Sequence, residues 1–144
     1  MSIEENKANL HRVTEEVFNK GNLAVVDELV STNSVTHAAG GEEFKGPEGF
    51  KQMVTMIRTA FPDFHMTIED IVAEGDKLAY RYTWRGTHKG EYMGIAPTGK
   101  QVTVTGMNIV HFVGGKGIES WTSGDNLSMM QQLGVVPPMG QGGG

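Results

Sequence analysis

The stretch FHMTIEDIVAEGDKLAYRYTWRGTH, Phe64–His88, decides the predicted fold. Two runs rich in β-branched and aromatic residues flank Gly75-Asp76, a dipeptide typical of two-residue hairpin turns. Two further strand patterns follow, at Lys100–Val113 and Gly117–Asp125, and a glycine-rich turn separates them. These connections leave no room for crossover helices, so the sequence predicts four long antiparallel strands in its second half.

Helical patterns dominate the N-terminal part. A capping box formed by Ser2 and Glu5 begins a helix that Gly21 ends, and Pro47 lies in the first turn of a helix that Pro62 ends. The sequence therefore predicts an α+β fold: a cone-shaped half-barrel of long curved antiparallel strands, packed on N-terminal helices and enclosing a pocket. The shorter expected elements are a helix at Leu23–Val30, a strand at Ser34–Ala39 and a closing helix at Asn126–Gly134.

Length and composition restrict the class of protein. We expect the 144 residues to form one domain over residues 1–134, followed by a Pro/Gly-rich tail over 135–144. The lack of cysteine excludes disulfides and Cys-ligated metals, and it suits the cytoplasm. The formal charge of −5, with Lys and Arg scattered singly, argues against a nucleic-acid partner. No membrane partner is expected, because neither a bilayer-spanning apolar run nor a signal peptide is evident.

Side-chain alternation along the strands predicts which residues point inward. Trp121 and Asp125 share one face of the last predicted strand, which we expect to be the inner face. His111 has the same parity as Met107 on the preceding strand, and Arg81 alternates with small residues that would leave room for an inward arginine. A carboxylate among apolar side chains is a suitable general base, and a histidine could donate to an enolate oxygen.

Short segments in order along the chain resemble the SnoaL-like polyketide cyclases, within the nuclear-transport-factor-2-like superfamily. The resemblance extends from the first helix to Gly134. It rests on Thr36-His37, Gly46-Pro47-Glu48-Gly49, Ala60-Phe61-Pro62-Asp63, Glu74-Gly75-Asp76-Lys77, Gly86-Thr87-His88, the loop Gly90–Lys100, and Glu119-x-Trp121 with Asp125.

The resemblance implies a cofactor-independent cyclase or isomerase. In this family an aspartate at the end of the last long strand abstracts a C–H proton next to a carbonyl of a polyketide ester, and the enolate closes a ring by intramolecular aldol attack. Asp125 matches that aspartate, and His37 and His111 match two pocket histidines. A small apolar carbonyl compound is the expected ligand. The expected substrate-binding residues are Trp121, Arg81, Met107, Phe18 and Met93.

Each of these residues also has a structural interpretation. Asp125 directly precedes a helix and could be its N-cap. Glu119 shares the parity of Asp125 and is either a second inward acid or an ion-pair partner of Arg81 or Arg85. The aromatic residues at positions 80, 82 and 84 take the opposite face, where core or a dimer surface is the more common use.

Other functions are kept as alternatives. An epoxide hydrolase or ketosteroid-isomerase-like enzyme could use the same fold, with Glu119 or Asp70 as a second acid. A non-catalytic module for binding a small ligand or for dimerisation is the alternative from another class. No metal site is expected, since no ligand spacing supports one, and no organic cofactor is expected. We expect a homodimer through the outer face of the sheet.

Overall fold

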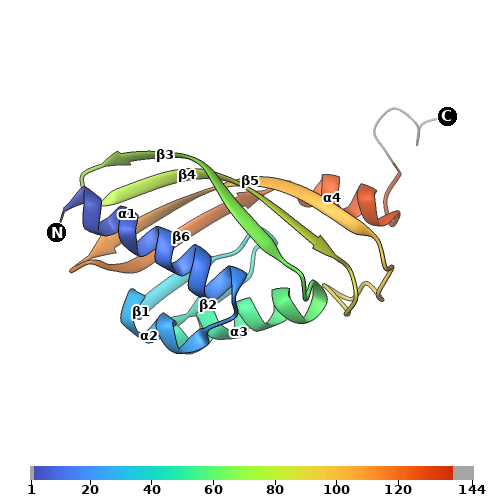
Figure 1. Cartoon of the computed structure of the whole chain (residues 1–144), viewed down its shortest axis with the longest axis horizontal. Coiled ribbons are helices and arrows are strands. Elements are labelled where there is room, and N and C mark those ends of the chain that lie inside the picture. Colours follow the sequence, from blue (N-terminus) through green and yellow to red (C-terminus); the bar gives the residue numbers. More distant parts are fainter. Residues whose placement is uncertain (1, 138–144) are drawn as a thin grey trace.

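A six-stranded sheet curls around the helices (Figure 1). The computed structural model describes residues 2–137. The strands are β1 (Val30–His37), β2 (Glu43–Lys45), β3 (His65–Glu74), β4 (Lys77–Thr87), β5 (Gln101–Val113) and β6 (Lys116–Gly124). The helices are α1 (Ile3–Arg12), α2 (Val26–Leu29), α3 (Gly46–Ala60) and α4 (Asn126–Leu133), with a π-helical segment η1 (Val13–Asn19) and a 3₁₀ turn η2 (Leu23–Val25).

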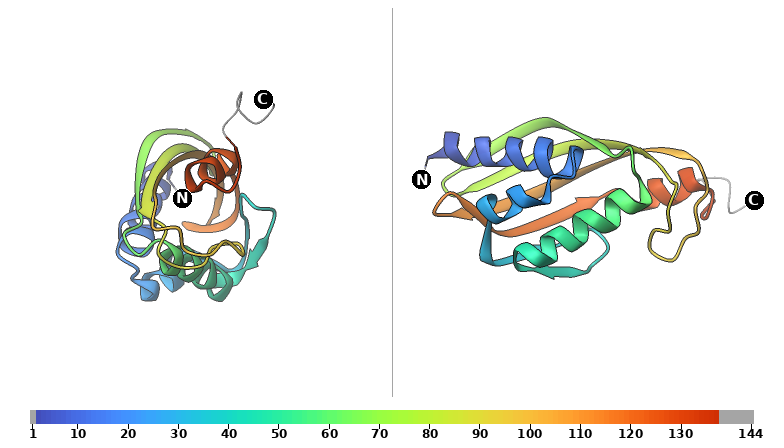
Figure 2. Two further views of the ribbon diagram at one scale, coloured as in Figure 1. Left: turned by 90° about the vertical axis from the view of Figure 1, so that its right-hand side faces the viewer. Right: turned by 60° about the horizontal axis from the view of Figure 1, so that its bottom comes forward.

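The sheet is mixed and open. Its strand order is β2-β1-β6-β5-β4-β3, so β2 and β3 are its two edges. The four long strands β3 to β6 are antiparallel neighbours, as predicted, whereas β1 runs parallel to β6. Viewed along the long axis, the strands form an incomplete ring with α1 and α3 on its open side (Figure 2). The prediction of an α+β cone with four long antiparallel strands is confirmed, and the parallel pairing of β1 with β6 makes the sheet mixed.

The N-terminal part differs most from the sequence-based expectation. The helix expected through Val30 ends at Leu29, and Val30 begins a strand that extends to His37. The short strand β2 pairs with β1 at the sheet edge and was not predicted. Both differences arise because β1 is stabilised by pairing with β6, which lies some eighty residues away in the chain and leaves no local signal.

The core lies between the sheet and the helices. One cluster joins the end of α3 to the long strands, and Phe61, Leu78 and Phe112 are almost wholly buried in it. A second cluster joins η1, α2 and α3 around Val17, Val26 and Val54. The helices therefore cover the concave face of the sheet.

Hydrogen bonds accepted by Asp63 hold the turn after α3 in place. Asp63 accepts hydrogen bonds from the Thr87 hydroxyl (2.7 Å) and the Thr87 backbone N–H (2.6 Å), which ties this turn to the end of β4. The Thr87 hydroxyl, followed by the Thr87 N–H, lowers the pKa of Asp63 below its usual value. The segment Ala60-Phe61-Pro62-Asp63 thus serves both the core and the turn.

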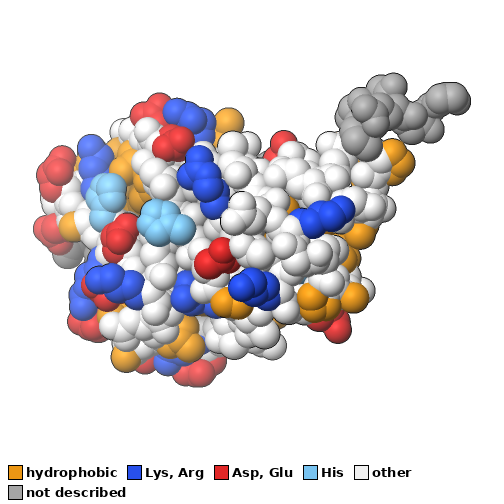
Figure 3. All heavy atoms as spheres, turned by 45° about the vertical axis from the view of Figure 1, so that its right-hand side comes forward, with side chains coloured by type: hydrophobic (Ala, Val, Ile, Leu, Met, Phe, Trp, Pro, Cys, Tyr) orange, Lys and Arg blue, Asp and Glu red, His pale blue; other side chains and the backbone are white. Residues whose placement is uncertain are grey.

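The face in Figure 3 carries acidic and basic side chains interspersed with one another, without a single-sign stripe. Within residues 2–137, no helix is long and apolar enough to span a membrane. Of the predicted tail over residues 135–144, residues 138–144 lie outside the described part of the chain.

Candidate functional site: an apolar cavity with a polar strip

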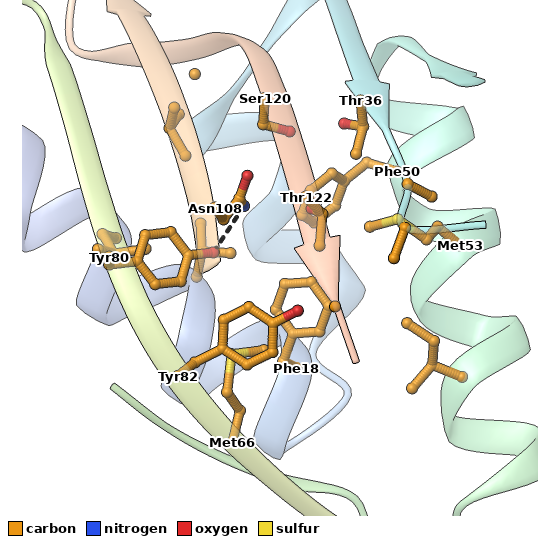
Figure 4. Close-up of a pocket in the computed structure, with 18 of the residues that line it drawn as sticks. Phe18, Thr36, Phe50, Met53, Met66, Tyr80, Tyr82, Asn108, Ser120 and Thr122 are labelled. Atoms are coloured by element: carbon orange, nitrogen blue, oxygen red, sulfur yellow. Dashed lines mark hydrogen bonds between the residues drawn. The ribbon is translucent and has the colours of Figure 1, made fainter. Parts of the chain in front are cut away.

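A partly open cavity of about 170 Å³ lies between the concave face of the sheet and the helices. Phe18, Phe50 and Met53 line its helical side, and Figure 4 shows them facing the strands across the cavity. An apolar cavity of about 150 Å³ is large enough to bind benzene. This cavity therefore accommodates a ligand core of about one aromatic ring.

Strand β4 contributes an aromatic row to the cavity. Tyr80, Tyr82 and Trp84 all line it, whereas Arg81 and Arg85 point outward and are exposed. The sequence-based parity of this strand was therefore inverted. The signal that could have found the inner face was the pair of arginines, because two arginines of the same parity mark a solvent face more often than a cavity.

The Tyr82 hydroxyl occupies a recess formed by two glycines. Gly106 of β5 and Gly124 of β6 are directly opposite each other in the sheet. A methyl group at Gly106 would collide with the Tyr82 hydroxyl, and one at Gly124 would lie 3.3 Å from it. Burial raises the pKa of Tyr82 well above its usual value, and the nearby phenols of Tyr80 and Tyr92 add to the effect. Tyr82 is therefore a neutral O–H donor at the cavity.

Asn108 and Tyr80 form a second polar pair. Asn108 Nδ2 donates to Tyr80 Oη at 2.9 Å (dashed in Figure 4). Burial raises the pKa of Tyr80, while the hydrogen bond from Asn108 opposes that shift. This phenol is consequently neutral as well. Sequence analysis missed Tyr80, Tyr82 and Asn108 because their strands had been assigned the opposite inner face.

Small polar side chains form the rest of the strip. Ser34 and Thr36 of β1, together with Ser120 and Thr122 of β6, line the cavity. Figure 4 shows Thr36, Ser120 and Thr122 with Asn108 around one space. Large side chains at these positions would fill the cavity, so small ones keep it empty. This is why a hydrophobicity argument, which places Trp121 inside, fails on β6.

Several predicted substrate contacts lie on the outer face of the sheet. Met107 is 62% exposed and Trp121 is 40% exposed, and neither they nor Arg81 and His111 belong to the cavity lining. The prediction that His37, His111, Trp121 and Asp125 converge on one cavity was wrong. The physical reason is that Met107, Ile109 and Trp121 lie on the convex face, while small residues of β6 form the cavity wall.

His37 lies in a cluster beside the β1–β6 seam. Its Nε2 donates to Glu119 Oε2 at 2.7 Å, and its Nδ1 lies 3.3 Å from Glu43 Oε2. The imidazole stacks on Trp121 with ring centroids 5.8 Å apart. Glu119, for which sequence analysis left open an inward acid or an ion pair with an arginine, is thus paired with His37. The residue belongs to the cavity lining, but it shares the strand face of Trp121, so its carboxylate lies on the outer side of the wall. His111 is opposite Glu119 in the sheet register.

Asp125 caps α4. Its Oδ1 accepts a hydrogen bond from the Ser128 backbone N–H at 3.0 Å, and its side chain is exposed. The structural interpretation of this residue as an N-cap is confirmed. The inward orientation expected from parity was wrong, because the neighbours Gly124 and Asn126 are the ones that border the cavity.

The last two predicted substrate-binding residues, Phe18 and Met93, differ in position. Phe18 lines the cavity, as expected for a substrate-binding residue. Met93 is 44% exposed in the loop between β4 and β5, has a φ of 51°, and lies outside the lining. Its loop neighbour Tyr92 reaches the cavity instead. In residues 2–137 no group of three or more His, Cys, Asp or Glu side chains is arranged to hold a metal ion.

Comparison with known proteins assigns the family. Residues 8–133 match the model of the SnoaL-like polyketide cyclases. The chain is 26% identical over 130 residues to the aklanonic acid methyl ester cyclase DnrD of Streptomyces peucetius, covering 88% of this chain and 90% of DnrD. The crystal structure of IdmH from Streptomyces antibioticus, assigned as a polyketide cyclase, superposes with a TM-score of 0.78 at 34% identity, covering 90% of this chain and 99% of IdmH.

A third comparison supports the fold alone. A SnoaL-like structure from Jannaschia sp. has a TM-score of 0.86 at 21% identity, and it covers 96% of this chain and 98% of its own. The open α+β cone described above agrees with these matches. The chain belongs to the SnoaL-like polyketide cyclase family.

Proposed function

We propose that this chain is a cofactor-independent cyclase or isomerase that binds a neutral, polyketide-like carbonyl compound in the cavity. The observation that carries this proposal is a mostly apolar cavity whose polar strip consists of neutral donors and acceptors. Glu119 is the one lining residue, among those described, with an ionisable carboxyl group. The proposed reaction is removal of a proton next to a carbonyl, followed by intramolecular aldol-type ring closure of an ester.

The strip can stabilise the intermediate of that reaction. Loss of the proton places negative charge on the carbonyl oxygen, and an O–H donor in a site of low dielectric stabilises that charge. Tyr82 is the best placed donor, because its hydroxyl is protonated, faces the cavity and makes no hydrogen bond to any described residue. The apolar helical side excludes water from the enolate.

Sequence analysis named Asp125 as the proton acceptor. In the structure, the Asp125 carboxylate is engaged in the cap of α4 and lies outside the lining. Glu119 is the one carboxyl-bearing residue of the lining among those described, and its carboxylate is held by His37 on the outer side of the β1–β6 wall, beside Trp121. We therefore propose Glu119 as the base: its side chain turns from His37 into the cavity to take the substrate proton.

Tyr82→Phe tests the role of the donor. Removal of one such donor costs roughly a hundredfold in turnover, so we expect a loss of that order in the exchange of the C2 proton of ethyl benzoylacetate for deuterium, followed by NMR. The matched control is Thr83→Val, which removes a hydroxyl from the opposite face of the same strand. Equal rates for Tyr82→Phe and wild type would contradict the proposal.

A ligand-binding module without catalysis is the second candidate. The observation in its favour is that Glu119, the one acid of the lining among the described residues, is already hydrogen-bonded to His37 on the outer side of the wall. The same exchange experiment separates the two functions, since a pure binding module would not exceed the buffer rate. Of the two acids considered for an epoxide hydrolase, Asp70 is exposed on β3 and is not part of the lining.

We infer a homodimer through the outer face of the sheet. Val72, Ala79, Ile109 and Trp121 occupy successive strands in one register row, and Val72 is 67% and Ile109 45% exposed. Together with Met107 they form a contiguous apolar patch on a face that no helix covers, which is typical of an interaction site.

The dimer is tested with Met107→Asp/Ile109→Asp. Burying two carboxylates in the patch is unfavourable, so we expect a halved molar mass in light scattering after gel filtration. The control is Met56→Asp, which adds a charge at an exposed residue of α3. A wild-type protein that is monomeric at about 100 μM, the upper range for weak association, would contradict this inference.

A further inference from the structure

The Asn108–Tyr80 pair leaves one hydrogen-bond acceptor unused at the cavity. Because Asn108 Nδ2 donates to Tyr80 Oη, its Oδ1 is directed away from β4. This oxygen is buried and has no hydrogen-bond partner among residues 2–137. Buried polar atoms are rarely left unpaired. A ligand that brings an O–H group to this point would satisfy it.

A second unpaired group lies across the strip. The Oγ of Ser34 on β1 is buried without a partner in the described chain, and the residue is only 4% exposed. Strand β6 lies between β1 and β5: Asn108 is opposite Thr122, whereas Ser34 precedes by two residues Thr36, which is opposite Ser120. Both unpaired groups belong to the sheet side of the cavity lining, and Asn108 is the one beside the strip hydroxyl of Thr122.

The lining also selects against charge. It contains no Lys, Arg or His side chain among the described residues, and the Glu119 carboxylate is paired with His37. A ligand carboxylate would lose its hydration without gaining a cation. A neutral ester or ketone satisfies the donors of the strip without that cost.

We propose that Asn108, held in place by Tyr80, is a specificity-determining residue that selects neutral carbonyl compounds bearing a hydroxyl group, whose O–H donates to Asn108 Oδ1. This proposal rests on the proposed function, since it concerns the ligand of the same cavity. Tyr80 acts as a positioning residue: it keeps Oδ1 directed toward the ligand and need not touch it.

Three one-ring probes test the proposal: methyl 3-hydroxybenzoate, methyl benzoate and 3-hydroxybenzoate, each titrated into the wild-type protein by calorimetry at pH 7. One added hydrogen bond to a buried acceptor corresponds to about a three- to tenfold gain in affinity, so methyl 3-hydroxybenzoate should bind more tightly than methyl benzoate by that factor. The anion 3-hydroxybenzoate should bind at least about tenfold more weakly than its ester.

Three variants test whether Asn108 causes the preference for the hydroxylated ester. Asn108→Leu should abolish the preference for the hydroxylated ester while leaving methyl benzoate affinity within about threefold, since it removes the acceptor and retains an apolar side chain of similar size. Tyr80→Phe should reduce the preference, because it frees the amide to rotate. Thr105→Val, on the outer face of the same strand, is the control and should retain the wild-type preference.

Three outcomes would overturn the proposal, and they differ in meaning. Equal wild-type affinity for the two esters, or a preference that persists in Asn108→Leu, would exclude selection by Asn108 but leave the cavity as an ester site. Binding of neither ester would exclude both this proposal and the proposed function. If Asn108→Leu fails to fold, the wild-type comparison and Tyr80→Phe still decide.

Discussion

Glu119→Gln should lower the rate of proton exchange at C2 of ethyl benzoylacetate by roughly two to four orders of magnitude, the usual contribution of a general base. Gln keeps the length of the side chain and can still accept a hydrogen bond from His37 Nε2, which lies 2.7 Å from Oε2 of Glu119 in the wild type. It cannot accept the substrate proton. The measurement is NMR exchange in D₂O, with thermal unfolding to confirm that the fold is retained.

Asp125→Asn is the matched variant for that experiment. Asn can cap α4 through its side-chain oxygen, as Asp125 does toward the Ser128 N–H, so stability should change little, while Asp125→Ala should cost about 1 kcal/mol. The exchange rate of Asp125→Asn should stay near that of the wild type. The reverse result, a slow Asp125→Asn and an active Glu119→Gln, would restore the base that sequence analysis named and would rule out Glu119.

Phe61→Ala should destabilise the fold by about 3–5 kcal/mol, the usual cost of truncating a buried phenylalanine. Phe61 is fully buried at the end of α3. Its ring contacts Trp84 edge-on at a centroid distance of 5.0 Å, Tyr92 at 5.4 Å and His88 at 5.4 Å. The truncation therefore removes the centre of an aromatic cluster that joins α3, β4 and the β4–β5 loop. Urea unfolding measures the change.

The control for Phe61→Ala is Pro62→Ala, its exposed neighbour, which should change the free energy of unfolding by much less. Phe61→Leu should fall in between, because Leu retains most of the apolar volume but leaves the three ring contacts unmade. A loss of less than about 1 kcal/mol for Phe61→Ala would show that the cluster is not a structural centre, given the range usual for such truncations.

Local patterns were enough for the four long strands. The hairpin at Gly75-Asp76, the glycines between β5 and β6, and Pro62 after α3 are each read within a few residues, and each predicted boundary lies within about two residues of the observed one. The N-cap formed by Asp125 is likewise predictable from local sequence, because the capping oxygen of Asp125 and the N–H of Ser128 are only three residues apart.

The residues around the cavity could not be found in that way. Alternation tells which side chains share a face of a strand, but not which face meets the helices. On β4 the inner face could have been identified from charge, because the charged Arg81 favours solvent and the opposite face carries Tyr82. On β6 it was not, because a cavity wall needs small residues such as Thr122, while the convex face carries Trp121.

The sequence by itself determined the succession of helices and strands, the hairpin register and the family, because these depend on neighbouring residues and on motif order. Only the tertiary structure decided that β1 pairs with β6, that Glu119 meets His37, and that Asn108 and Tyr82 face the ligand space. These contacts join segments far apart in the chain. Their geometry is set by how the sheet curls around the helices, and no local pattern encodes that curvature.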